Sequence, residues 1–140
     1  MTLLRTPSQT VGPFYAIGLC RRPENELVPR DEPGAVQLVG QLFDGEEVPV
    51  NDGVIEVWDG ANHRWGRCGT DADGRFSFSV GNAPHLEVYV FARGLLRHQL
   101  TRIYFSDEAP HPELVAEHEN GAYRFDIRLQ GERQTVFFDV

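Results

Sequence analysis

The sequence contains no lysine, a single methionine and only two cysteines, Cys20 and Cys68. The two cysteines have neither CxxC nor zinc-type spacing, and two isolated thiols are typical of small buried residues in a reducing compartment. No stretch approaches the roughly 20 apolar residues of a membrane span, and the N-terminus lacks the apolar segment of a signal peptide. These absences predict a cytoplasmic protein without disulfides.

Local motifs of common catalytic sites are also missing. The sequence has no HExxH or HxH, no nucleophile elbow and no glycine-rich phosphate loop between a strand and a helix. The nearest approach to a metal pair is His85 and Glu87, whose spacing of two places both side chains on one face of a strand. No third ligand lies nearby in the sequence, so ordinary strand residues are favoured over a metal site.

The charge is strongly acidic, with 21 acidic and 13 basic residues and a formal net charge of −8. A field of this sign repels phosphate backbones, which argues against a nucleic-acid partner. It also repels organic anions, so any bound carboxylate must be met by a local arginine.

With 140 residues and 41% hydrophobic residues, the chain is long enough for one domain with a core. Short runs with a period of two, separated by turn residues, predict an all-β fold, a single β-sandwich of about seven to eight strands over residues 36–140. A short helix is expected at Pro112–His118. The expected strands are Val36–Phe43, Val54–Trp58, Arg75–Val80, Leu86–Ala92, Thr101–Phe105, Tyr123–Gln130 and Thr135–Val140.

Residues 1–35 have a different composition, rich in both proline and glycine. Proline removes backbone donors and glycine weakens regular elements, which predicts an irregular N-terminal arm belonging to the same domain. The arm also contains several apolar residues between positions 11 and 19, too many for a disordered tail. We therefore expect it to lie on a surface, which can belong to another subunit.

Several segments resemble one known family, in the same order along nearly the whole chain. Residues 6–14 read TPSQTVGPF and resemble the TPSQTxGPY arm of the intradiol ring-cleaving dioxygenases, in particular protocatechuate 3,4-dioxygenase α chains. APH at 83–85, FARG at 91–94 and TRIYF at 101–105 resemble the middle of those chains. YRFDIRLQGE at 123–132 and TVFFD at 135–139 resemble their end.

The resemblance implies an enzyme subunit that works with a partner. The enzyme that these chains belong to uses O₂ to cleave protocatechuate between its hydroxylated carbons, which gives 3-carboxy-cis,cis-muconate. Its Fe(III) is held by two Tyr and two His of a β subunit. This sequence has His85-Leu86-Glu87 in place of His-x-His, and offers Trp65 where the first ligand Tyr is expected. We therefore expect neither metal ligands nor catalytic residues here, and a hetero-oligomer with an iron-bearing β subunit.

The same resemblance suggests residues that line the substrate pocket: Thr10, Gly12 and Pro13 in the arm, and Arg93 after a strand. Gly12 allows close backbone approach, and Arg93 can hold the substrate carboxylate. The alternatives are an arm that only docks and an Arg93 that pairs with a surface carboxylate. Arg102 and Arg128 are expected in structural or interface pairs.

Two other functions stay open at this stage. One is a homomeric intradiol dioxygenase with an atypical iron site, against which the missing tyrosines argue. The other is a non-catalytic β-sandwich binding module related only by fold, since fold does not fix function.

The chain is also shorter than the family's α chains, with loops reduced after Leu19, after Trp58, before His85 and after Glu108. Such shortening affects recognition and oligomer contacts more than the fold.

Overall fold

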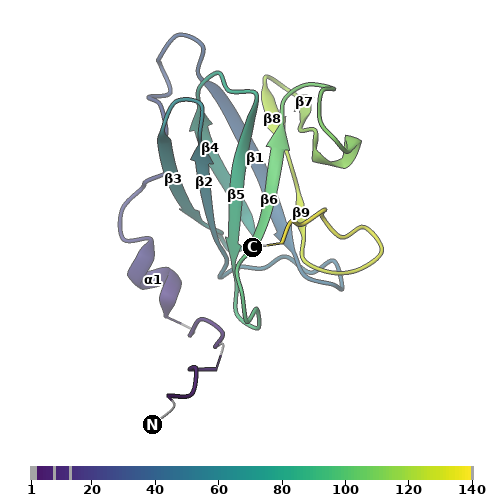
Figure 1. Ribbon diagram of the computed structural model, residues 1–140. Helices are drawn as coiled ribbons and strands as arrows, with labels where there is room; N and C mark the ends of the chain where they lie inside the picture. The colour runs from purple at the N-terminus through teal and green to yellow at the C-terminus, as the bar shows by residue number, and fades with distance from the viewer. Residues whose placement is uncertain (1–2, 8, 13, 140) are drawn as a thin grey trace.

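The computed structural model describes residues 3–7, 9–12 and 14–139, which form two packed β-sheets and an N-terminal arm (Figure 1). No helix in these residues has the length and apolar character needed to cross a membrane. The arm contains one short helix, α1 (Tyr15–Leu19). The first sheet consists of β1 (Val36–Phe43), β4 (Arg75–Val80), β7 (Glu117–Glu119), β8 (Ala122–Arg124) and β9 (Ile127–Arg128). The second consists of β2 (Val54–Asp59), β3 (Arg64–Gly69), β5 (His85–Phe91) and β6 (Gln99–Tyr104).

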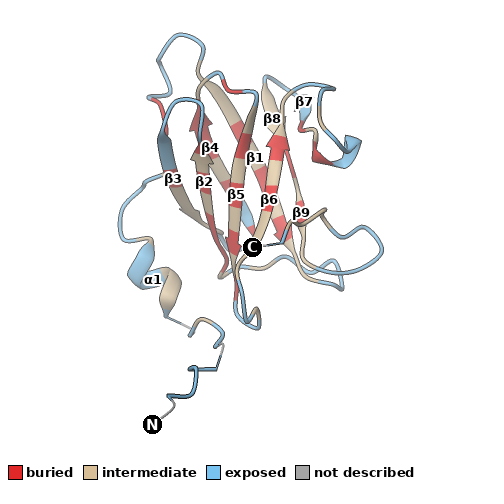
Figure 2. Cartoon of the chain, viewed as in Figure 1, coloured by how far each residue is buried: buried red, intermediate tan, exposed pale blue. Residues whose placement is uncertain are grey.

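The strand order is β4-β1-β8-β7 in the first sheet, with β9 also paired to β1, and β3-β2-β5-β6 in the second. The prediction of an all-β sandwich is confirmed, and five expected strands occur with ends shifted by at most two residues. Their alternation fills the core: on β5, for example, Leu86, Val88 and Val90 are fully buried between the sheets. Figure 2 shows this burial along the facing strands.

The expected single strand Tyr123–Gln130 is wrong, because the structure divides it into β8 and β9. At the break, the backbone N–H of Gln41 donates to the Asp126 carboxylate at 3.0 Å, so a side chain replaces a ladder partner. The Phe125 carbonyl approaches β1 at Gly40, where a Cβ would lie 2.0 Å from that oxygen. The period of two in this segment still fits its burial, since Phe125 and Ile127 are buried and Leu129 is partly buried against the core.

Two further predicted elements need correction. Residues 135–139 form no strand; they lie beside β6, where Phe138 makes an isolated bridge with Leu100, while Val140 lies outside the described residues. The Thr101 hydroxyl donates to the Val136 carbonyl at 2.8 Å, which holds this segment without a regular ladder. The expected helix Pro112–His118 is a single 3₁₀ turn, Pro112–Leu114, and the following residues enter β7 instead.

Two elements were missed, and both lack the usual sequence signal. β3 reads RWGRCG, with two arginines and two glycines, because it is an edge strand that needs no continuous apolar face. α1 has five residues and no side-chain cap, so its sequence contains no start signal.

The segment 24–28 joins the two sheets at one side of the sandwich. The backbone of Glu24 accepts a hydrogen bond from Arg67 of β3 at 2.8 Å, and that of Asn25 accepts one from Ser79 of β4 at 2.9 Å. Leu27 occupies space beside Gly66, where a Cβ would lie 2.4 Å from the Leu27 side chain. The segment therefore closes the side at which β3 and β4 are the edge strands.

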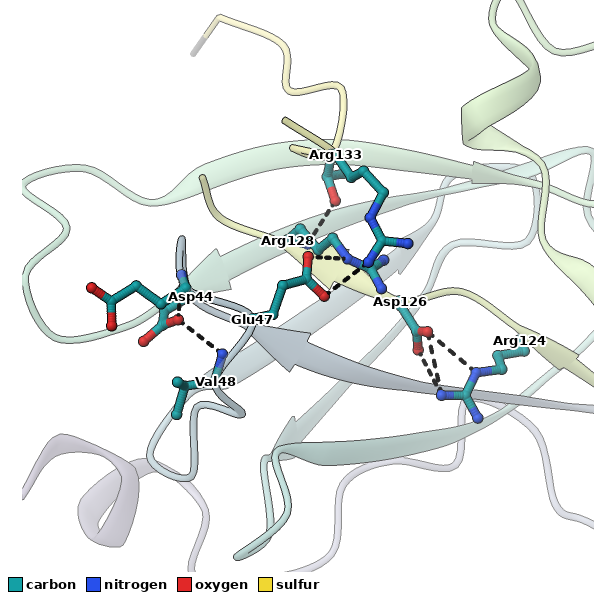
Figure 3. Close-up of polar contacts among 9 residues, drawn as sticks. Asp44, Glu47, Val48, Arg124, Asp126, Arg128 and Arg133 are labelled. Carbon is teal, nitrogen blue, oxygen red and sulfur yellow. Dashed lines mark hydrogen bonds and ion pairs between the residues drawn. The ribbon is translucent and has the colours of Figure 1, made fainter. Parts of the chain in front are cut away.

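Ion pairs fasten the C-terminal region to the β1–β2 connection (Figure 3). The Glu47 carboxylate forms ion pairs with the Arg128 guanidinium at 2.9 Å and the Arg133 guanidinium at 3.2 Å. A third pair, between Arg124 and Asp126 at 3.3 Å, lies within the C-terminal region itself. On the other sheet Arg102 pairs with Glu87 at 3.7 Å. The expectation that Arg102 and Arg128 belong to structural pairs is confirmed.

Candidate functional site

The end of β5 places Arg93 opposite the start of β2. The antiparallel register pairs Val54 with Phe91, and two residues further along it faces Asp52 toward Arg93. The guanidinium Nε of Arg93 forms an ion pair with the Asp52 carboxylate. The Arg93 side chain is still 56% exposed, so the guanidinium remains reachable from solvent while one edge is held.

The N-terminal arm docks on the same place. The Thr10 hydroxyl accepts a hydrogen bond from the backbone N–H of Gly94 at 2.7 Å. The Tyr15 hydroxyl lies within hydrogen-bonding reach of two backbone carbonyls, that of Phe91 at 3.0 Å and that of Asp52. We call the set Thr10, Tyr15, Asp52, Arg93 and Gly94 the arm latch, because it holds the arm to both strand ends.

The arm latch changes the chemistry of Tyr15. Burial of the hydroxyl, reinforced by the Asp52 carboxylate and the Cys20 thiol, raises the pKa of Tyr15 to about 12, although the Arg93 cation acts in the opposite direction. Tyr15 therefore stays a neutral hydrogen-bond donor over the whole physiological range. A tyrosinate there would face two carbonyl oxygens without a proton to donate.

The structure brings together two of the four residues predicted for the pocket. Thr10 bonds to Gly94, the neighbour of Arg93, and Arg93 has the carboxylate partner that the alternative interpretation expected. Gly12 lies in the same stretch, and a Cβ there would meet nothing within 4 Å. Space at Gly12 is therefore open to a ligand or a partner chain. Pro13 lies outside the described residues.

The residues at the expected iron position do not suit a metal ion. Glu87 is already paired with Arg102 at 3.7 Å and accepts a hydrogen bond from the Tyr89 hydroxyl at 3.2 Å. His85 stacks on Tyr104 with ring centroids 5.1 Å apart. Among the described residues no group of three or more His, Cys, Asp or Glu could hold a metal ion. The Glu87 carboxylate is thus engaged with Arg102 and Tyr89, and the described part of the chain places no third ligand beside Glu87 and His85.

Trp65 is also unsuited to bind a metal, because an indole offers no anionic oxygen. It lies on β3 opposite Trp58 of β2, and the Arg67 guanidinium covers its ring at 4.8 Å. Arg67 in turn pairs with Glu56 at 2.6 Å. This face of the second sheet is thus built from aromatic rings and internally neutralised ion pairs.

Tyr15 and Asp52 are the site residues that the sequence did not indicate. Asn51-Asp52-Gly53 predicts only a turn, and the contact of Asp52 with a residue 41 positions away depends on the pairing of β2 with β5. Tyr15 stands in a stretch without periodicity, so its role has no local signal. Placing Asp52 beside Arg93 would have required the correct register between β2 and β5.

The arm exposes an unusual amount of apolar surface. Large apolar residues are normally covered, yet Leu4 is 93% exposed and Phe14 74%. Leu3, Ile17 and Leu19 add to this surface from the same arm. In Figure 1 the arm extends beyond one end of the two sheets, and the exposed fractions show that the sandwich leaves these side chains uncovered.

Comparison with known proteins gives a consistent result. No family model matches the chain. The chain is 34% identical over 195 positions to a protocatechuate 3,4-dioxygenase alpha chain of Burkholderia cepacia, covering 99% of both chains. It is 34% identical to the alpha chain of Pseudomonas putida, covering 98% of this chain and 97% of that one. Since the alignments span 195 positions and this chain has 140 residues, the relatives carry segments that this chain lacks.

Solved structures agree at the level of fold. The dioxygenase domain of a Streptomyces sp. SirexAA-E fusion protein superposes with a TM-score of 0.61 at 22% identity, over 78% of this chain and 88% of that one. Hydroxyquinol 1,2-dioxygenase from Pseudomonas putida DLL-E4 gives a TM-score of 0.62 at 13% identity, over 94% of this chain and 64% of that one. Taken with the identity over nearly its full length, these findings show that the chain belongs to the intradiol dioxygenase family of protocatechuate 3,4-dioxygenase alpha chains.

Proposed function

We propose that the chain is the α subunit of a protocatechuate 3,4-dioxygenase, supporting O₂-dependent ring cleavage of protocatechuate to 3-carboxy-cis,cis-muconate. The observation that carries this proposal is the similarity to alpha chains over 99% of both sequences. In this assignment the arm (residues 1–35) and the sandwich (residues 36–140) act as one unit.

The partner in this proposal is an iron-bearing β subunit. Two features of the chain support a partner: the apolar arm that the sandwich leaves uncovered, and His85 and Glu87 side chains that are engaged elsewhere. Fe(III) bound in the partner would supply the oxygen chemistry, while this chain would complete the pocket. Free thiols at Cys20 and Cys68 suit the reducing cytoplasm, where we place the enzyme.

The pocket residues that we assign to this chain are Thr10, Gly12, Pro13 and Arg93. Arg93 would receive the substrate carboxylate with the exposed part of its guanidinium, while Asp52 fixes the orientation of the other edge. Thr10 holds the arm beside Arg93 through Gly94. The open space at Gly12 would let the backbone approach the substrate closely.

Co-expression with an intradiol dioxygenase β chain tests the proposal. We expect a red ferric complex that cleaves protocatechuate, whereas this chain purified alone is colourless and inactive. The double variant His85→Gln, Glu87→Gln is a matched control and should leave the iron content of the complex unchanged. Stoichiometric iron and catechol cleavage in the isolated chain would instead establish a homomeric dioxygenase. A monomer that ignores every β chain would establish a binding module.

A further inference from the structure

A cavity of about 600 Å³ lies between the N-terminal arm and the connection from β5 to β6. Its volume falls in the range of about 300–1,000 Å³ that is typical of small-molecule sites. It is next to the arm latch but is separate from the Arg93–Asp52 pair. The side chains that define its chemistry are Arg5 and Val11 from the arm, and Phe91, Leu95, Arg97 and His98 from the opposite wall.

This cavity is lined by basic residues, whereas the protein as a whole is acidic. Most arginines of this acidic chain, including Arg93, pair with a carboxylate. Within the described residues, Arg5 and Arg97 have no carboxylate at ion-pair distance. Two arginines, one from each wall, therefore line one cavity without a carboxylate partner of their own. Such a pair attracts an anion that the protein does not itself supply.

The remaining walls are apolar or aromatic. The Phe91 and His98 rings lie 5.5 Å apart with an interplanar angle of 35°. Leu95 lines the cavity beside them, and Leu96, which also lines it, is 62% exposed. An inorganic anion would leave this surface in water. An anion with a flat apolar body would cover it while its charged end meets the arginines.

We propose that this cavity binds a small aromatic carboxylate, with the carboxylate at Arg5 and Arg97 and the ring against Phe91 and Leu95. All the residues named for this site belong to this chain. The choice of a hydroxybenzoate as natural ligand rests on the proposed function, for which the cavity would collect substrate beside the arm. The charge and the shape of the cavity do not depend on that choice.

Calorimetric titration of the full chain without a partner tests this inference. The probes are benzoate, benzamide, which keeps the ring but not the charge, and acetate, which keeps the charge but not the ring. We expect benzoate to bind one site about tenfold or more tighter than benzamide, because benzamide loses the charged hydrogen bonds to the arginines. Benzoate should also bind about tenfold or more tighter than acetate, because acetate has no ring to cover the apolar wall. Equal binding of benzamide and benzoate would overturn the proposal, as would an absence of benzoate binding.

Substitutions locate the binding. Arg5→Gln with Arg97→Gln should weaken benzoate binding about tenfold or more, and both side chains are exposed, so circular dichroism should be unchanged. The matched control is Arg21→Gln with Arg22→Gln, which removes the same charge from a different cavity, beside α1, and should have no effect. Equal weakening by both double variants would mean a general charge effect and would refute the site.

Failure here is distinguishable from failure of the α-subunit assignment. If the isolated chain ignores benzoate but forms an active ferric complex with a β chain, only the cavity proposal is wrong. If it binds benzoate at this cavity and never associates with a β chain, only the α-subunit assignment is wrong.

Discussion

The hydroxyl of Thr10 accepts the backbone N–H of Gly94 at 2.7 Å, joining residues 84 positions apart and fixing the arm to the loop after β5. Thr10→Val removes the acceptor but keeps the shape. We expect faster hydrogen exchange at the Gly94 amide and faster proteolysis of the arm, with global stability changed by less than about 1 kcal/mol because the bond is exposed. Thr10→Ser keeps the hydroxyl and should behave as the wild type. Unchanged exchange in Thr10→Val would remove this bond from the latch.

Arg93→Ala in the assembled enzyme should raise KM for protocatechuate about tenfold with iron content unchanged, because a charged contact to the carboxylate is lost. Asp52→Asn should raise KM less, since the guanidinium remains and loses only its anchor. Steady-state kinetics and iron analysis measure both effects, with Arg22→Ala, an arginine outside the set of latch residues, as a control. An unaltered KM in Arg93→Ala would exclude Arg93 from substrate binding.

Gly40→Ala should destabilise the sandwich by about 3 kcal/mol or prevent folding, because the new Cβ would lie 2.0 Å from the Phe125 carbonyl oxygen and 2.5 Å from the Phe76 ring. Gly18→Ala is the matched control. It lies in α1 with nothing within 4 Å of its Cβ, so it should be neutral or slightly stabilising. Urea unfolding compares the two, and equal stabilities would contradict the close approach of β1 and residue 125.

The Tyr15 hydroxyl should lose its proton at a higher pH than an ordinary tyrosine. Its pKa is about 12 when the arm is docked and about 10 as an ordinary tyrosine, so docking favours the protonated hydroxyl. The contribution of this group to stability is therefore complete below about pH 10 and is lost as the pH rises toward 12. The tyrosinate absorbance difference between wild type and Tyr15→Phe should show a transition near pH 12. A transition near pH 10 would mean that the hydroxyl is not held by the latch.

The sequence predicted the parts of the fold that depend on alternation. Leu38 and Leu42 of β1 are four positions apart and the inward residues of β5 are spaced by two, so each set lies on one face of its strand, and their burial requires no knowledge of distant partners. The prediction from sequence was wrong where a side chain distant in the sequence replaced a backbone hydrogen-bond partner of the strand. The Asp126 carboxylate takes the Gln41 amide and interrupts the expected sixth strand, and nothing in residues 123–130 reveals that Gln41 lies alongside.

The candidate site shows the same division. Resemblance to a known family indicated Thr10 and Arg93, and the structure places them next to each other through Gly94. Asp52, Tyr15 and the pair Arg5 and Arg97 could not be found, because their meaning comes from the register of β2 with β5 and from the path of the arm. Exposed arginines look alike in a sequence, and only the neighbours of each show whether its charge is neutralised.

The clip formed by residues 24–28 has a consequence for the behaviour of the protein in concentrated solution. By hydrogen-bonding to Arg67 of β3 and Ser79 of β4, it uses backbone groups that would otherwise be open to strand addition. Removal of residues 1–28 would uncover both edges together and favour edge-to-edge aggregation. Removal of residues 1–19 alone would leave the clip in place and the protein dispersed.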